Sequence, residues 1–111
     1  MSTGSSPTPE TPDAAAQEWR DLTDRLVFDE LWQRTGLTPR ERSIVTVAVL
    51  FARGGPAGAT RFHTRRAHEN GLSFAELHEI AVHTAFYAGW PAGSPAVGLV
   101  GELWAEEGEQ A

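Results

Sequence analysis

Two copies of one helix-start signal constrain most strongly what this chain can fold into. Thr38, Pro39 and Glu41 form a T-P-x-E sequence in which the Thr38 hydroxyl can cap the helix and Glu41 can return a hydrogen bond to the cap. Pro39 suits the first helical position, where no backbone donor is needed. Ser73 and Glu76 have the spacing of a second capping box. The sequence therefore predicts two helices that begin at defined residues.

The first of these helices contains a run of residues that favours a strand. Ile44–Val49 reads IVTVAV, and β-branched side chains are typical of sheets. The cap before this run and the glycine pair at 54–55 after it favour a helix instead, so we predict a helix over residues 39–53. The second capping box predicts a helix from about residue 73 to 88, ended by the Gly-Trp-Pro sequence at 89–91.

Three further helices are expected. Apolar residues recur at spacings near three and four between Trp19 and Trp32, which indicates an amphipathic helix that begins near Asp13 and ends at Gly36. Residues 57–70 form another helical stretch, and Ser94-Pro95 can start a last helix that ends near Trp104. The predicted fold is an all-α, single-domain bundle of about five or six helices.

The 111 residues fit one domain and divide into three expected parts. Residues 1–12 lack large apolar side chains and are expected to be disordered; residues 13–105 form the helical domain; residues 106–111 form an acidic tail. The N-terminus has no apolar segment typical of a secretory signal, and no apolar run is long enough to span a bilayer. We expect a cytoplasmic protein without a membrane partner.

Charge and cysteine content restrict the chemistry. Fifteen acidic residues against nine lysines and arginines give a net charge of −6, which repels a phosphate backbone, so we expect no nucleic-acid partner. The absence of cysteine excludes disulfides, thiolate nucleophiles and Cys-ligated metals. His63 and His68 are five residues apart, as are His78 and His83, and this spacing does not place a pair on one helix face. We therefore expect no metal.

Several segments, in their order and spacing, resemble the carboxymuconolactone decarboxylase family. They are LTPRERS at 37–43, H-x3-A-x3-G at His63, Ala67 and Gly71, S-x-x-E-L-x-E-I at 73–80, and HTAFYAGWPA at 83–92. The resemblance covers roughly Leu26 to Val97. It implies the helical fold of alkyl hydroperoxidase D-like proteins.

The resemblance divides into two branches, which cysteine distinguishes. The C-x-x-C pair of alkyl hydroperoxidase D-like members falls on Pro56 and Ala59, so we expect no thiol peroxidase activity. The other branch resembles γ-carboxymuconolactone decarboxylase, which implies chemistry without a metal or organic cofactor and a ring-shaped homo-oligomer, a trimer or a hexamer. The chain departs from this branch at Ala59, where Glu is frequent, and at Ser94 and Pro95, where Asn and His are frequent.

Decarboxylation without a cofactor needs a proton donor and an anchor for a carboxylate. The family motif falls on His63, which titrates near neutrality and has the small residues Ala59 and Ala67 one turn away, so we predict that it is the donor. Arg42 can bind a carboxylate bidentately, and Ser43 can add a hydroxyl. The alternatives are a structural histidine, a salt-bridged arginine and a serine bonded to its own helix.

A second group of candidates lies at the end of the helix over 73–88. His83 and Tyr87 are four residues apart and share a face, which Glu79 extends by one turn. Trp90 follows the helix and can wall a pocket for an aromatic ligand. The alternative is that Tyr87 anchors an interface, His83 bonds to the backbone and Trp90 belongs to the core.

Together these features predict a carboxy-lyase that acts by acid–base chemistry on a lactone, an enol or a related carbonyl acid. The predicted partners are a carboxylated small molecule and further copies of the chain. A cofactor-free cyclase or isomerase of a specialised pathway is one alternative. The other is a non-catalytic helical protein that binds a ligand or a partner.

Overall fold

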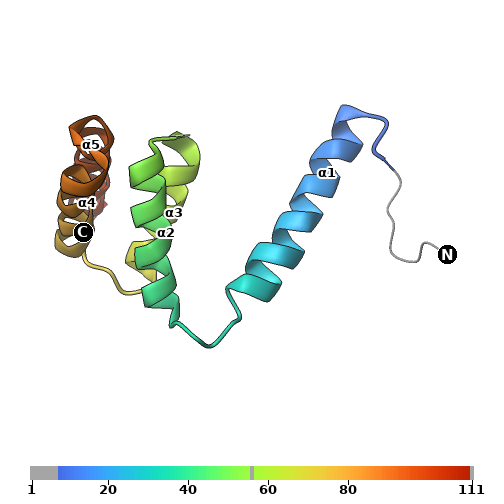
Figure 1. Cartoon of the computed structure of the whole chain (residues 1–111), viewed down its shortest axis with the longest axis horizontal. Coiled ribbons are helices and arrows are strands. Elements are labelled where there is room, and N and C mark those ends of the chain that lie inside the picture. Colours follow the sequence, from blue (N-terminus) through green and yellow to red (C-terminus); the bar gives the residue numbers. More distant parts are fainter. Residues whose placement is uncertain (1–7, 56, 111) are drawn as a thin grey trace. The chain divides into compact units, whose positions relative to one another are not determined.

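The structure is a computed structural model that describes residues 8–55 and 57–110. The helical elements are α1 (Pro12–Leu22), a π-helix η1 (Thr23–Leu31), α2 (Pro39–Arg53), α3 (Ala57–Glu69), α4 (Phe74–Ala88) and α5 (Trp90–Gln110) (Figure 1). No strand occurs among the described residues, so the predicted all-α class is confirmed. The chain divides into two compact units, one up to Gly36 and one from Leu37 onwards.

The N-terminal unit is a helix that changes its winding. Thr11 caps α1 by accepting a hydrogen bond from the Ala14 backbone N–H at 3.1 Å. The end of η1 has π-type bonding, because the Trp32 N–H donates to the Val27 carbonyl five residues earlier at 2.9 Å. The predicted end of this helix at Gly36 is wrong, because the helical winding changes to π-type at Thr23 and ends at Leu31. The predicted disordered segment 1–12 falls largely outside the described residues.

The second unit begins with the capping box at α2. The Glu41 N–H donates to Thr38 Oγ1 at 3.1 Å, and the Thr38 N–H donates to Glu41 Oε1 at 2.8 Å. The helix ends at Gly54, whose φ of 74° is left-handed. Val47 in the β-branched run is fully buried, so core packing and the two end signals override the strand preference. Ser73 and Glu76 form the second predicted capping box.

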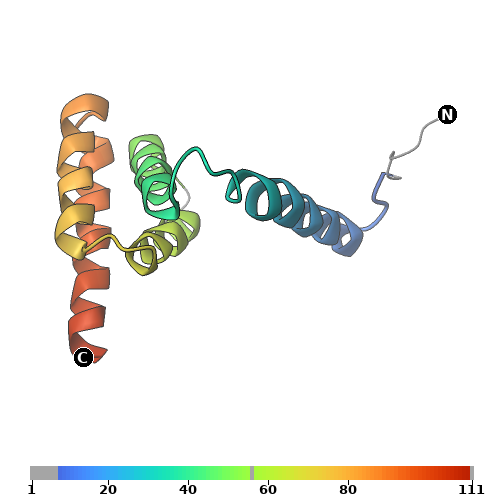
Figure 2. The ribbon, with the colours of Figure 1, turned by 90° about the horizontal axis from the view of Figure 1, so that it is seen from below.

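The core of the second unit joins all four of its helices. α2 packs against α3, α4 and α5, while α4 and α5 form the most extensive pair. The largest fully buried side chains are Phe51, Leu72, Leu77, Val47, Val100 and Thr64. Figure 2 shows α4 and α5 side by side as an antiparallel hairpin, with Gly89 between them. These contacts fix the relative positions of the α2 and α3 residues discussed below.

Helix α5 is longer than predicted at both ends. It begins at Trp90, so the predicted start at Ser94 is wrong: Pro91 occupies a first-turn position, where its missing N–H costs no helical hydrogen bond. Pro95 lies inside the helix. The predicted end near Trp104 is also wrong, since the helix continues to Gln110.

Ion pairs join the C-terminal part of α5 to α3. Glu106 pairs with Arg61 and, at 2.6 Å, with Arg65. The hydrogen bond from Arg65 is the main cause of the lowered pKa of Glu106. Such exposed pairs each contribute little, but together they hold the added helical turns against α3.

None of the described helices is long and apolar enough to cross a membrane.

The closest approach of α4 and α5 predicts a mutational effect. A Cβ atom at Gly93 would lie 2.3 Å from the Ala85 Cβ, so Gly93→Ala should lower the free energy of unfolding by about 1–3 kcal/mol through overpacking. Gly101→Ala is the matched control on the same helix, because its Cβ would meet no atom within 4 Å. The control should raise stability by about 0.5–1 kcal/mol. Urea denaturation of both variants measures the difference, and equal stabilities would contradict the packing argument.

Candidate functional site

The predicted site residues fall on two parts of the second unit. Arg42 and Ser43 lie on α2, and His63 lies on α3, which packs against it. His83 and Tyr87 lie on α4, and Trp90 begins α5. The first group is half-buried or buried, whereas the second is exposed.

Ser43 is a buried contact between α2 and α3. Its side chain is 2% exposed, and its Oγ accepts a hydrogen bond from Asn70 Nδ2 at 2.9 Å. Asn70 was not among the residues predicted from the sequence. An asparagine before Gly71 signals a helix end, and the pairing with Ser43 becomes visible only when the two helices are packed together. The hydroxyl of Ser43 therefore helps to set the spacing of α2 and α3.

Arg42 is half-buried on α2, and its Nε atom is enclosed by the protein. The side chain of Glu41, the residue before it, closes the capping box with Thr38. The Arg42 backbone carbonyl accepts a hydrogen bond from Thr46 Oγ1 at 2.8 Å. The guanidinium is thus carried on a helix whose first turns are fixed by capping and by the Thr46 hydroxyl.

His63 is half-buried on α3, and its surroundings disfavour the charged imidazolium. Burial is the first cause that lowers its pKa below the ordinary value of 6.5, and the positive charge of Arg66 is the second. Arg66 lies one helical turn further along α3 and is a second residue that the sequence analysis did not select. His63 is therefore mainly neutral at pH 7, as an acceptor or a donor depending on its tautomer.

The space beside His63 differs from the sequence expectation. Ala67, one turn after it, is fully buried in the core, so this small residue serves packing. Ala59, one turn before it, is exposed, and the ring of Phe62 meets the imidazole edge-on at 5.0 Å between centroids. Of the two small neighbours of His63, only Ala59 is therefore exposed.

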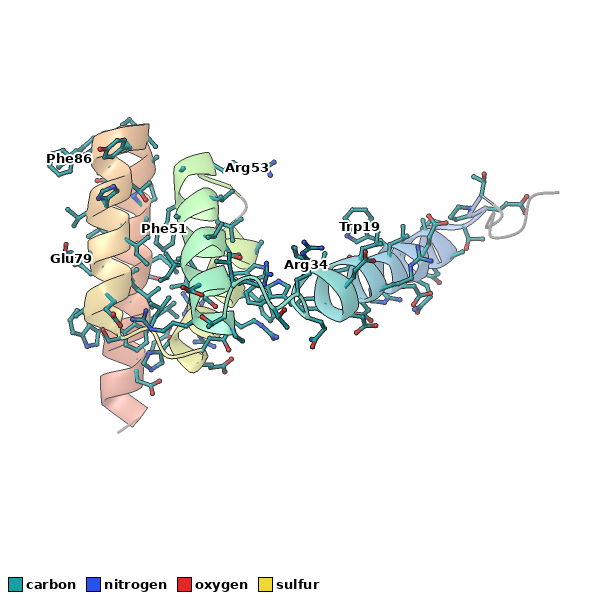
Figure 3. All side chains as sticks on the ribbon, turned by 60° about the horizontal axis from the view of Figure 1, so that its bottom comes forward. Trp19, Arg34, Phe51, Arg53, Glu79 and Phe86 are labelled. Carbon is teal, nitrogen blue, oxygen red and sulfur yellow. The ribbon has the colours of Figure 1, made fainter. Side chains whose placement is uncertain are left out.

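The second group forms an exposed aromatic patch, which we define as His83, Phe86, Tyr87 and Trp90. The rings of His83 and Tyr87 stack at 4.8 Å, as their shared helix face predicts, and those of Phe86 and Trp90 meet edge-on at 5.7 Å. Tyr87 is 84% and Trp90 63% exposed. Phe86 projects outward from α4 in Figure 3. These contacts do not place the patch beside His63.

Of the other two histidines, only His68 has contacts that indicate a role. His68 Nδ1 lies 2.8 Å from the Leu72 carbonyl oxygen, and its ring stacks on Phe74 at 4.1 Å. Within residues 8–55 and 57–110, no group of three or more His, Asp or Glu residues is arranged to hold a metal ion. We find no physical role for His78.

Comparisons with known proteins identify a matching family and two sequence relatives. The model of the carboxymuconolactone decarboxylase family matches residues 17–102. The chain is 36% identical over 92 residues to 4-carboxymuconolactone decarboxylase of Acinetobacter baylyi, covering 83% of this chain and 68% of the relative. It is 31% identical over 72 residues to nitrosuccinic acid decarboxylase of Metarhizium robertsii, covering 65% of this chain and 50% of that relative.

The lowered pKa of His63 predicts how stability changes with pH. Below pH 6.5 the unfolded chain binds a proton at His63 more readily than the folded chain, so the free energy of unfolding should fall as pH falls from 6.5 through the lowered pKa. His63→Gln should remove this part of the pH dependence. Chemical denaturation of both proteins across this range gives the difference, in which other titrating groups cancel. An NMR titration that places the pKa of His63 above 6.5 would contradict the prediction.

Proposed function

The chain belongs to the carboxymuconolactone decarboxylase family, and from this premise we propose that it is a cofactor-independent decarboxylase of a small carboxylated lactone, enol or carbonyl acid. Two relatives that bear decarboxylase names support this reaction type. The observation on which the proposal mainly depends is the half-buried position of His63, beside Arg66, on a helix that packs against α2, the helix of Arg42.

In the proposed reaction, the bond between the substrate and its carboxylate carbon breaks. The electron pair stays on the substrate as an enolate, and carbon dioxide leaves. The imidazolium of His63, the minor form at neutral pH, donates its proton to the carbanionic carbon, and the ring later recovers a proton from water. Both causes that lower the pKa of His63, burial and Arg66, make its imidazolium a stronger acid.

Two arginines supply positive charge on this face. Arg42 and Arg66 are both half-buried, with their Nε atoms enclosed by the protein. A guanidinium held in a partly dry site binds carboxylate more strongly than one in water, because the surrounding dielectric constant is lower. We assign the carboxylate anchor to Arg42. Arg66 adjusts the acidity of His63 and adds charge that stabilises the enolate.

Substitutions at these two positions separate acid catalysis from binding. His63→Gln should lose about 10²- to 10⁴-fold in kcat while substrate binding is retained, because the amide cannot donate the proton. Arg42→Ala should chiefly raise KM, with a smaller loss in kcat if Arg42 also orients the substrate. Steady-state kinetics on carboxylated lactones, with carbon dioxide release as the readout, measures both effects.

The comparison needs folded controls and distinct outcomes. Unfolding midpoints and particle mass must match the wild type, because both side chains are partly buried. A folded and fully active His63→Gln variant would show that His63 is not the donor. A product of the same mass as the substrate, without carbon dioxide, would instead indicate the cyclase or isomerase alternative.

We also propose that the protein is a homo-oligomer, a trimer or a hexamer. Val45 and Val49 share one exposed face of α2 and are 52% and 54% exposed, and Phe62 on α3 is 52% exposed. With the exposed aromatic patch, these side chains are large apolar groups of the kind that contacts between subunits cover.

Light scattering tests this assembly directly. At micromolar concentration the particle should have three or six times the chain mass of 12.0 kDa. Val49→Glu, which places a charge on the apolar face of α2, should reduce that mass without changing helical content. A wild-type particle of 12.0 kDa would overturn the proposal.

A further inference from the structure

We propose that a cleft between α2, α3 and α5 binds a small apolar molecule that carries one carboxylate. The cleft has a volume of about 540 Å³, within the range of roughly 300–1,000 Å³ that is usual for small-molecule sites. None of the six site residues predicted from the sequence lines it. The inference is independent of the proposed decarboxylase activity.

The cleft lies on a different side of α3 from His63. Arg61 lines the cleft, and His63 is two residues further along the helix. Two residues correspond to about 200° of rotation, so the two side chains leave α3 in nearly opposite directions. A ligand in the cleft would therefore bind apart from the proposed proton donor.

The walls of the cleft are apolar. They are formed chiefly by Leu50, Phe51, Ala92, Pro95, Ala96 and Leu99. Glycines add open volume: a Cβ at Gly54, Gly55, Gly58 or Gly98 would meet no atom within 4 Å. The Thr60 hydroxyl donates internally to the Gly55 carbonyl at 3.0 Å. The walls therefore suit a compact hydrocarbon or aromatic ring.

The charged side chains at the cleft are Arg61 and Glu102, and their arrangement indicates an anionic group on the ligand. Arg61 Nη1 lies 3.2 Å from Glu102, and its Nη2 pairs with Glu106. The Glu102 side chain is 67% exposed, whereas that of Arg61 is 35% exposed. The Glu102 side chain can thus rotate out into the solvent at little cost in free energy. Arg61 then stays at the cleft and keeps its ion pair with Glu106. A ligand carboxylate can take the place of Glu102 on the guanidinium.

The test uses benzoate as the probe and benzyl alcohol as its uncharged counterpart. Binding of each compound is measured from the NMR shifts of the backbone amides in the full chain. Benzoate should bind more tightly than the alcohol and should shift the amides of Gly54, Gly55 and Gly98. Glu102→Gln should raise the affinity for benzoate several-fold, because it removes the competing carboxylate. The affinity for benzyl alcohol should not change. Arg61→Met should lower the affinity for benzoate about tenfold.

Two matched controls locate the site. Glu107→Gln makes the same change of charge on α5 at a residue that does not line the cleft, so it should leave benzoate binding unchanged. Gly98→Leu should weaken both probes by filling the cleft, whereas Gly101→Leu, also in open space on α5, should not. His63→Gln should bind benzoate with the affinity of the wild type. Failure of the decarboxylase proposal can therefore be distinguished from failure of the cleft proposal.

Three outcomes would overturn the inference. The first is the absence of amide shifts with either probe at millimolar concentration. The second is equal benzoate affinity in Gly98→Leu and Gly101→Leu, both with wild-type unfolding midpoints. The third is a changed particle mass in Gly98→Leu with unchanged benzoate affinity, which would mean that a second copy of the chain covers the cleft.

Discussion

The second unit depends on α2 being a helix, because α2 contacts each of the other three helices. Its sequence contains a β-branched run, so local preference alone does not decide its conformation. The capping box at Thr38 and Glu41 starts the helix at a fixed residue and so sets which side chains face inward. That register buries Val47 and Phe51 in the core and turns Ser43 toward Asn70. A shift of one residue would remove all of these contacts together.

Features set by short-range chemistry could be predicted from the sequence, and those set by packing could not. Capping residues and glycines predicted the bounds of α2 closely and those of α3 and α4 to within a residue or so. The family match confirms the resemblance. The π-type winding of η1 leaves no recognisable mark in the apolar spacing. The start of α5 was misplaced because the Gly-Trp-Pro sequence was interpreted as a break, whereas the approach of Gly93 to Ala85 continues the hairpin.

The candidate site divides in the same way. The family motif selected His63 and Arg42, and the four-residue spacing predicted the stacking of His83 on Tyr87. The sequence could not reveal the burial of His63 or the influence of Arg66, because a pKa depends on surroundings that only the packed helices create. The contacts separate the half-buried residues of α2 and α3 from an exposed aromatic patch.

Helix α3 has charged side chains on two flanks, on either side of a buried face that includes two threonines. Thr60 and Thr64 face inward, and each hydroxyl donates to a backbone carbonyl nearby, at 3.0 and 2.7 Å. Each of these bonds satisfies the hydroxyl donor within the same stretch of chain. His63 and Arg66 lie on one flank of α3, while Arg61 and Arg65 pair with Glu106 of α5 on the other. One short helix thus carries His63, whose pKa is lowered by burial and by Arg66, and separately the ion pairs that join it to α5.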